Sequence, residues 1–435
     1  MQSYSEIESH YAAQLPAERT FTSGTFVLFM SVLLVVLAFI PLVPPSDAIE
    51  GGGFTGRGVI EIALIVMGLV LMGMYAKAKD IPAFDFRNSS FAIITLFACW
   101  AIVSSLWSPN PMLSIAKAAE LWSIMIAASM FVTIGCRIYS QKNQLETTLA
   151  FALLSVLVIL IVANLFFWGT PLPNTGDESL PLQLLGEEPP VLIERPRLIL
   201  AYAHPLLTGD FLALSIVCLL ATRMNRMLKV VALPFLLWLL WMADARGPSI
   251  AIVASLIAMI VLQVRRQSVR AIVITLLLSV GLAITMLFQD KLLKPISALL
   301  TDDVYTLNSR TELWARAFEH IGQQPITGYG YSSSRYLLMK DFIWGGHAHN
   351  SFIEVLLTTG LVGFILFCIY LAYICRDVIT TRNSLLLGVI VYSVIQGMLN
   401  PLLFTPGLPM FVLTIAVLNA RWKHETSFNH REVAA

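Results

Sequence analysis

The residues HAHN at positions 347–350 combine side chains that could carry out acid–base chemistry at the head of an apolar segment. A histidine titrates near neutral pH, so it can take the proton from a hydroxyl group as that group attacks. Ser351 and Glu354 have the S-x-x-E spacing of a capping box, which predicts that a helix begins near Asn350 and gives Glu354 a structural role. His349 is therefore the candidate base, just ahead of a helix N-terminus, and His347 is expected to be structural or exposed.

A second candidate group is Arg310, in the stretch NSRTELWARAFEHIGQQPITGYGYSS. Ser309 and Glu312 form another S-x-x-E pair, and the apolar residues that follow share one helical stripe, which predicts a short amphipathic helix over 310–321. Arg310 and the free N–H groups of the first turn could together bind an anion, and phosphate is the obvious candidate. A solvated loop arginine is the alternative. The stripe consists of Leu313, Trp314, Ala317, Phe318 and Ile321.

Several glycines accompany these residues. Gly328 and Gly330 flank Tyr329, where they could let the backbone approach a ligand closely or could simply form turns. Gly360 and Gly363 lie on one face of the predicted helix, so we expect them to let a neighbouring helix pack closely.

The composition indicates the elements that must position these side chains. The chain has 435 residues, of which 57% are hydrophobic and 13% charged, whereas a soluble domain carries about a quarter charged residues. Its apolar stretches have the length of about 17–25 residues that crosses a bilayer as a helix. We predict an all-α, polytopic membrane protein with about twelve spans, at residues 24–44, 58–76, 91–107, 113–136, 146–168, 205–222, 227–243, 248–264, 270–288, 351–375, 384–400 and 405–420.

The positions of Lys and Arg predict the orientation of these spans. Basic residues gather in alternate connections, whereas the short connections between them carry only Arg57 and Arg246. The positive-inside rule then places both termini in the cytoplasm. The residues on the basic side are Arg19, Lys77, Lys79, Arg87, Arg137, Lys142, Arg223, Arg226, Lys229, Arg265, Arg266, Arg270, Arg376, Arg382, Arg421, Lys423 and Arg431.

Two long polar segments, 169–204 and 289–350, fall on the external side. Loops longer than about 15 residues are usually functional or disordered, and the second contains the predicted helix, so any chemistry should face away from the cytoplasm. The predicted organisation is a cytoplasmic tail (1–23), nine spans (24–288), a large, partly helical external loop (289–350), three spans (351–420) and a cytoplasmic tail (421–435).

The region that contains these motifs resembles a known family. His349 and Asn350, nine further residues and then Gly360-Leu-Val-Gly363 match the H-[NSQ]-x9-G-x-x-G signature of the O-antigen ligase and Wzy-type polymerase superfamily. The preceding SRTELWARAF and GYG also resemble the loop before that signature, so the local resemblance covers 309–363. Within the superfamily, TELW and HAHN are slightly more similar to the exopolysaccharide polymerases than to the ligases.

The resemblance implies a GT-C-like helical bundle in the bacterial inner membrane that acts at its periplasmic face. It implies metal-independent chemistry without a cofactor, on glycans linked to undecaprenyl pyrophosphate, with one histidine and several arginines as essential residues. His349 and Arg310 match by motif. Arg246, in MADARGPSIA, matches an arginine that enters the eighth span, although Ala245 replaces the usual serine.

Further site residues follow with less support from the motif. Arg197 resembles an arginine before the sixth span, with Asn350, Tyr329, Gly328 and Gly330 as further substrate-binding candidates. Non-catalytic roles are the alternatives: an ion pair with Asp244 for Arg246, an ordinary loop charge for Arg197, and a structural or exposed position for His204.

The sequence therefore predicts a glycosyltransferase that polymerises surface polysaccharide repeats, with His349 as the base and Arg310, Arg246 and Arg197 on the diphosphate. A ligase that transfers the glycan to lipid A–core is the first alternative. A metal mechanism would need Asp302 and Asp303, or Asp47 and Glu50, and neither pair has convincing partners.

A non-enzymatic alternative is that the protein transports lipid-linked glycan. Such folds usually show two similar halves and discontinuous helices, whereas this chain shows no internal repeat and its polar residues gather at one face. The expected partners are the lipid-linked donor, a glycan or lipid A–core acceptor, membrane lipids and proteins of a polysaccharide assembly complex. No nucleic acid is expected.

Overall fold

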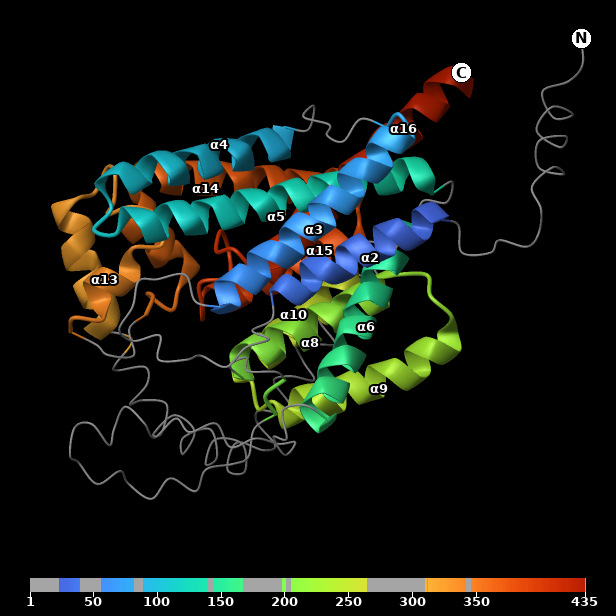
Figure 1. Cartoon of the computed structure of the whole chain (residues 1–435), viewed down its shortest axis with the longest axis horizontal. Helices are drawn as coiled ribbons and strands as arrows, with labels where there is room; N and C mark the ends of the chain where they lie inside the picture. The colour runs from blue at the N-terminus through green and yellow to red at the C-terminus, as the bar shows by residue number, and fades with distance from the viewer. Residues whose placement is uncertain are drawn as a thin grey trace, which may run out of the picture.

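The computed structural model describes residues 23–39, 56–81, 89–139, 144–166, 198–200, 205–263, 310, 312–341 and 346–434, and every regular element among them is helical. A further helix, over residues 312–323, is present in addition to the helices labelled in Figure 1. The labelled elements are α2 (Ser23–Ala38), α3 (Gly56–Ala78), α4 (Ser89–Ser104), η1 (Ser105–Trp107), α5 (Pro111–Ile138), α6 (Gln144–Phe166), α8 (Pro205–Ala221), α9 (Arg226–Met242), α10 (Arg246–Gln263), α13 (Ser334–Leu338), α14 (Ser351–Thr381), α15 (Ser384–Gly397) and α16 (Leu408–Ala434).

The predicted spans overlap the helices that the structure describes. Every predicted span except the ninth, 270–288, overlaps one or two of the helices, and the ninth lies outside the described residues. Within the described part of the chain, five helices are long and apolar enough to cross a membrane: Val59–Ala78, Pro111–Ile138, Gln144–Asn164, Arg246–Gln263 and Ser351–Thr381. The chain is therefore a helical, multi-pass membrane protein, and the count of twelve spans stays a prediction.

Buried ion pairs hold the basic end of the bundle together. Lys423 on α16 lies 2.8 Å from the carboxylate of Glu146 at the start of α6, and Arg421 lies 3.0 Å from Asp377 near the end of α14. The α16 helix continues to Ala434, well past the predicted end of the last span.

The opposite end carries residues 312–341 and 346–350, as Figure 1 shows at the left of the bundle around α13. Tyr331 donates its backbone N–H to Ser104 Oγ at the end of α4, and Tyr336 bonds Asn110 before α5. Asn350 reaches Met398 just beyond α15. Helix ends that the alternating charge pattern places on one side therefore do meet in the structure.

An aromatic cluster locks α14 in place between these two ends. Phe404 lies between rings of three neighbours, with centroid distances of 4.1 Å to Phe97, 5.1 Å to Phe367 and 5.4 Å to Tyr370. Each aromatic pair contributes about 0.5–1.5 kcal/mol beyond its buried area. The cluster joins α4, α14 and the connection before α16, and so fixes the helix that carries His349 at its head.

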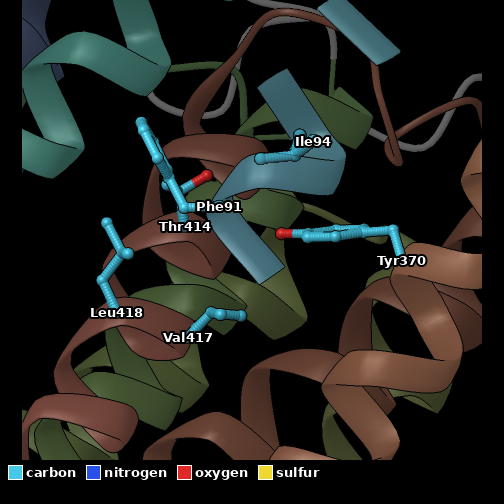
Figure 2. Close-up of a pocket in the computed structure, with 6 residues that line it drawn as sticks. All are labelled: Phe91, Ile94, Tyr370, Thr414, Val417 and Leu418. Carbon is cyan, nitrogen blue, oxygen red and sulfur yellow. The ribbon is translucent and has the colours of Figure 1, made fainter. Parts of the chain in front are cut away.

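A small crevice opens between α4, α14 and α16, and Figure 2 shows the side chains around it. Its lining is apolar except for the hydroxyl groups of Tyr370 and Thr414, and the Thr414 hydroxyl bonds the backbone of its own helix. No lining side chain could act as a base near neutral pH. The candidate catalytic residues lie instead at the end of the bundle that carries 312–341 and 346–350.

Candidate active site

The N-terminus of α14 begins where the sequence predicts, but through a different cap. Asn350 Oδ1 accepts hydrogen bonds from the backbone N–H groups of Phe352 (2.9 Å) and Ile353 (3.2 Å). The predicted capping box of Ser351 and Glu354 is therefore wrong. The hydroxyl group of Ser351 instead accepts the N–H of Leu403 at 3.1 Å, so it ties the helix start to the connection before α16.

Glu354 holds the residue that precedes His349. One carboxylate oxygen accepts the backbone N–H of Ala348 at 2.8 Å and the other accepts the hydroxyl group of Ser334 at 2.6 Å. The Glu354 residue is only 7% exposed. The predicted structural role of Glu354 is confirmed, although the group that it binds is the loop before the helix and not the helix N-terminus.

His349 lies between Ala348, which Glu354 binds, and Asn350, which caps α14, and its backbone conformation is strained. Its φ of 48° is in the left-handed region, which is unfavourable for a residue with a Cβ atom. Its backbone N–H donates to Nδ1 of His347 at 3.3 Å, and the two rings lie 4.1 Å apart at 62°. His347 therefore supports His349, and both rings are half-buried.

The helix over 312–323 contacts the same loop. Trp314 donates its indole N–H to the carbonyl oxygen of Ala348 at 2.8 Å. Arg310 precedes Trp314 by four residues, about one helical turn, and is half-buried. Its place beside the His349 loop stays a prediction.

The predicted apolar stripe of this helix is largely confirmed. Leu313, Ala317 and Ile321 pack in one cluster with Leu338 and Leu357. Phe318 does not belong to it, because it is 53% exposed. The helix continues to 323, two residues beyond the predicted end, and Ser309 of its predicted capping box lies outside the described residues.

Arg246 is the first residue of α10, and the residue after it contacts α15. A Cβ atom on the adjacent Gly247 would lie 2.5 Å from Oε1 of Gln396, near the C-terminal end of α15. Just beyond that end, the carbonyl oxygen of Met398 accepts the side-chain N–H of Asn350 at 3.2 Å. The residues that follow Arg246 and His349 therefore both contact the C-terminal end of α15 or the turn just beyond it.

Arg197 and His204 lie outside the described residues, as do Asp47, Glu50, Asp302 and Asp303. The residue after Arg197 is described: Leu198 donates its N–H to the carbonyl oxygen of Met242 at 2.8 Å, four residues before Arg246. Among the described residues, no group of three His, Cys, Asp or Glu side chains could hold a metal ion.

The loop over 325–330 explains the glycines that precede the site. Gly360 interrupts α14 with φ 66° and ψ −168°, a conformation that is essentially restricted to glycine. The loop pairs with the interrupted backbone on both sides. The bonds run from Tyr329 N to Leu357 O (3.1 Å), Gly330 N to Thr358 O (2.8 Å), Leu361 N to Pro325 O (2.8 Å) and Val362 N to Ile326 O (3.3 Å).

Two tryptophans complete this junction. Trp100 donates its indole N–H to Thr359 O at 2.9 Å, and Trp107 donates to Gly328 O at 3.0 Å. The prediction that Gly360 serves helix–helix packing is therefore wrong, because the backbone it meets belongs to a loop. The same prediction is confirmed for Gly363, whose Cβ position is 3.2 Å from Trp100 on α4.

Gly328 and Gly330 have positive φ values of 63° and 98°, and each has a close backbone or side-chain neighbour that a Cβ atom would meet. Tyr329 donates its hydroxyl to Gln323 at 3.1 Å, and its ring meets His320 edge-on at 5.6 Å. The structure thus gives all three residues a structural task, and their role in binding a substrate stays a prediction.

Sequence reasoning missed Asp210, a carboxylate buried inside the apolar helix α8. A single acid within an apolar stretch is a signal in itself, because ionisable residues in membrane helices are rare and usually functional. It also missed the indole of Trp314, whose bond to Ala348 depends on a contact between residues 34 positions apart.

Comparison with known protein families decides the class. Residues 230–368 match a family model described as O-antigen ligase. Over this segment the chain is similar to the O-antigen ligase family. The matched segment contains Arg246, Arg310 and His349, together with both glycines of the signature, whereas Arg197 precedes it. No curated protein matches the chain. The resemblance to the O-antigen ligase superfamily is confirmed over residues 230–368, and the match implies a membrane enzyme of the kind that transfers glycans.

Proposed function

We propose that the protein is a glycosyltransferase at the periplasmic face of the bacterial inner membrane that polymerises glycan repeats carried on undecaprenyl pyrophosphate. The observation that supports the proposal is that the elements that carry three predicted residues begin at the same end of the bundle. His349 heads α14, Arg310 lies on the helix that contacts Ala348, and Arg246 begins α10 beside the end of α15. All three lie in the segment that is similar to the O-antigen ligase family.

The proposed reaction is a direct displacement at the anomeric carbon. His349 accepts the proton of the acceptor hydroxyl, whose oxygen forms the new bond to the anomeric carbon. The bond from that carbon to the diphosphate oxygen breaks on the opposite side, and the electron pair leaves with the diphosphate. The anomeric configuration is therefore inverted, and neither a metal nor a cofactor takes part.

The negative charge of the diphosphate explains why the proposed site contains arginines. A diphosphate at the membrane boundary is poorly solvated, so guanidinium groups that bind two oxygens at once are valuable there. Arg310, Arg246 and Arg197 would bind the diphosphate and stabilise the charge that it gains as it leaves. The N-terminus of α14 adds the partial positive charge of a helix dipole beside His349.

The same chemistry serves a ligase, with lipid A–core in place of a second lipid-linked repeat as the acceptor. Transport of lipid-linked glycan is a second candidate function, because α14 is interrupted at Gly360 and discontinuous helices are common in transporters. At this interruption, however, the loop over 325–330 and two tryptophans occupy the exposed backbone groups. A closed junction of this kind favours a fixed scaffold for an enzyme over a transport site.

Deletion of the gene, followed by analysis of the surface glycan, tests the proposed function. Loss of long chains, with single lipid-linked repeats remaining, supports a polymerase, and complementation with His349→Ala should leave the defect in place. Long lipid-linked polymer without a lipid A anchor indicates a ligase instead. Unchanged surface glycan would contradict both.

A further inference from the structure

A buried polar cluster lies at the contact of α8, α10 and α15, beneath the first turn of α10. Asp210 on α8 is 2% exposed, and one of its carboxylate oxygens, Oδ1, accepts two hydrogen bonds. The donors are the hydroxyl group of Tyr392 and the side-chain amide of Gln396 (3.0 Å), both fully buried on α15. The cluster therefore joins a carboxylate in one apolar helix to two polar groups in another.

Two acceptor atoms of this cluster have no hydrogen-bond partner among the residues that the structure describes. They are Oδ2 of Asp210 and Oε1 of Gln396, and both are buried. Buried polar atoms without a partner are rare in proteins and call for an explanation. A carboxylate in a membrane helix is also a functional hypothesis by default, so packing alone is a poor account of this cluster.

The cluster meets α10 on both sides of Arg246. Oε1 of Gln396 lies 2.5 Å from the Cβ position of Gly247, the residue after Arg246. The Cβ position of Gly209, the residue before Asp210, lies 2.5 Å from Cβ of Ala245. The backbone of α8 and the side chain of Gln396 therefore enclose the turn that carries Arg246.

The bond to Asp210 determines which way the Gln396 amide points. Because Asp210 accepts from the amide nitrogen, the amide oxygen packs against Gly247 in the first turn of α10, without a hydrogen bond to any described residue. Asp210 thus fixes which atom of the amide lies against the turn that Arg246 begins.

We infer that Asp210 and Gln396 are positioning residues for Arg246. This inference rests on the proposed function of Arg246 in binding the diphosphate. These two residues hold the first turn of α10 so that the guanidinium group is presented to the diphosphate. Neither residue touches the substrate.

A double-mutant cycle tests this inference, with farnesyl diphosphate as the probe. Its dissociation constant is measured on the detergent-purified full chain at fixed ionic strength. Asp210→Ala is expected to weaken binding by about tenfold in the wild-type background and to have almost no further effect in Arg246→Ala, because coupled residues are not additive. Asp210→Asn, which keeps an acceptor oxygen, should recover most of the lost affinity. Ser215→Ala, a buried hydroxyl on the same helix, is the matched control.

The outcomes separate the inference from the proposed function. If Arg246→Ala weakens binding but Asp210→Ala does not, or if Asp210→Ala causes the same loss in both backgrounds, the inference is overturned and the proposed function stands. If Arg246→Ala binds as the wild type does, the proposed role of that arginine fails, and the inference fails with it. If Asp210→Ala cannot be obtained folded, Gln396→Leu takes its place with the same expectations.

Discussion

Gly328 and Gly360 face each other so closely that a Cβ atom on Gly328 would lie 2.5 Å from the backbone nitrogen of Gly360. The two glycines belong to the loop over 325–330 and to the interrupted helix α14, so their contact joins the loop to the helix that carries His349. The α14 helix is thereby divided into a short first part, 351–359, and a long second part, 361–381.

Gly360→Ala should therefore destabilise the protein and reduce turnover together. The alanine would have to adopt a backbone conformation that costs about 1–3 kcal/mol, and its Cβ would collide with the carbonyl oxygen of Ile326. Thermal unfolding in detergent measures the loss. Gly322→Ala is the control, since a Cβ atom there meets nothing within 4 Å. Equal melting temperatures for the two variants would show that the junction is not rigid.

Removal of the Glu354 carboxylate should affect catalysis more than binding of the donor. In Glu354→Leu the N–H of Ala348 and the hydroxyl group of Ser334 lose their acceptor, so the loop before His349 relaxes while the arginines remain. We expect kcat to fall by about 10-fold to 100-fold, because a misplaced base loses much of its effect, with little change in the affinity for the diphosphate. Glu312→Leu, on the exposed side of the neighbouring helix, is the control. A rise in KM at unchanged kcat would argue against this role.

The pKa of His320 predicts that the stability of the segment 312–330 depends on pH. Burial lowers the pKa of His320 below its ordinary value of 6.5, and the charge of Arg316 lowers it further, although Asp341 and Glu319 oppose that effect. The unfolded segment therefore binds a proton more readily than the folded one. The stability that neutral His320 contributes is fully present above pH 6.5 and is lost as the pH falls through 6.5 toward the lower folded value.

Hydrogen exchange measures this effect. After correction for the intrinsic exchange rate, amides of 312–330 should be less protected at pH 5 than at pH 7.5. The difference should shrink in His320→Phe, which keeps the edge-on contact with Tyr329 but cannot be protonated. The same pH dependence in both proteins would assign it to another group.

The sequence was sufficient for the features that depend on local pattern. Apolar length predicts the helices, and the His349-Asn350 pair lies at the start of α14 because Asn350 is a strong N-cap. The choice between Asn350 and Ser351 could not be made in advance, because both residue types cap helices well.

The features that sequence analysis missed all depend on distant partners. Gly360 has the spacing of a packing glycine, and only the backbone of 325–330 shows that it breaks the helix. Asp210 is an isolated acid in the sequence, and its donor Gln396 lies 186 residues away. The residues that follow Arg246 and His349 both contact the end of α15 or the turn just beyond it, and neither motif contains that helix end.

Single-turnover kinetics show whether His349 takes the proton of the attacking hydroxyl. Formation of the glycosidic bond is followed with purified protein and lipid-linked repeats, for the wild type, His349→Ala and His347→Ala. We expect His349→Ala to lose about 10²–10⁴-fold in rate, with the wild-type melting temperature and diphosphate affinity retained, while His347→Ala loses far less. A His349→Ala enzyme with near wild-type turnover would contradict this role of His349.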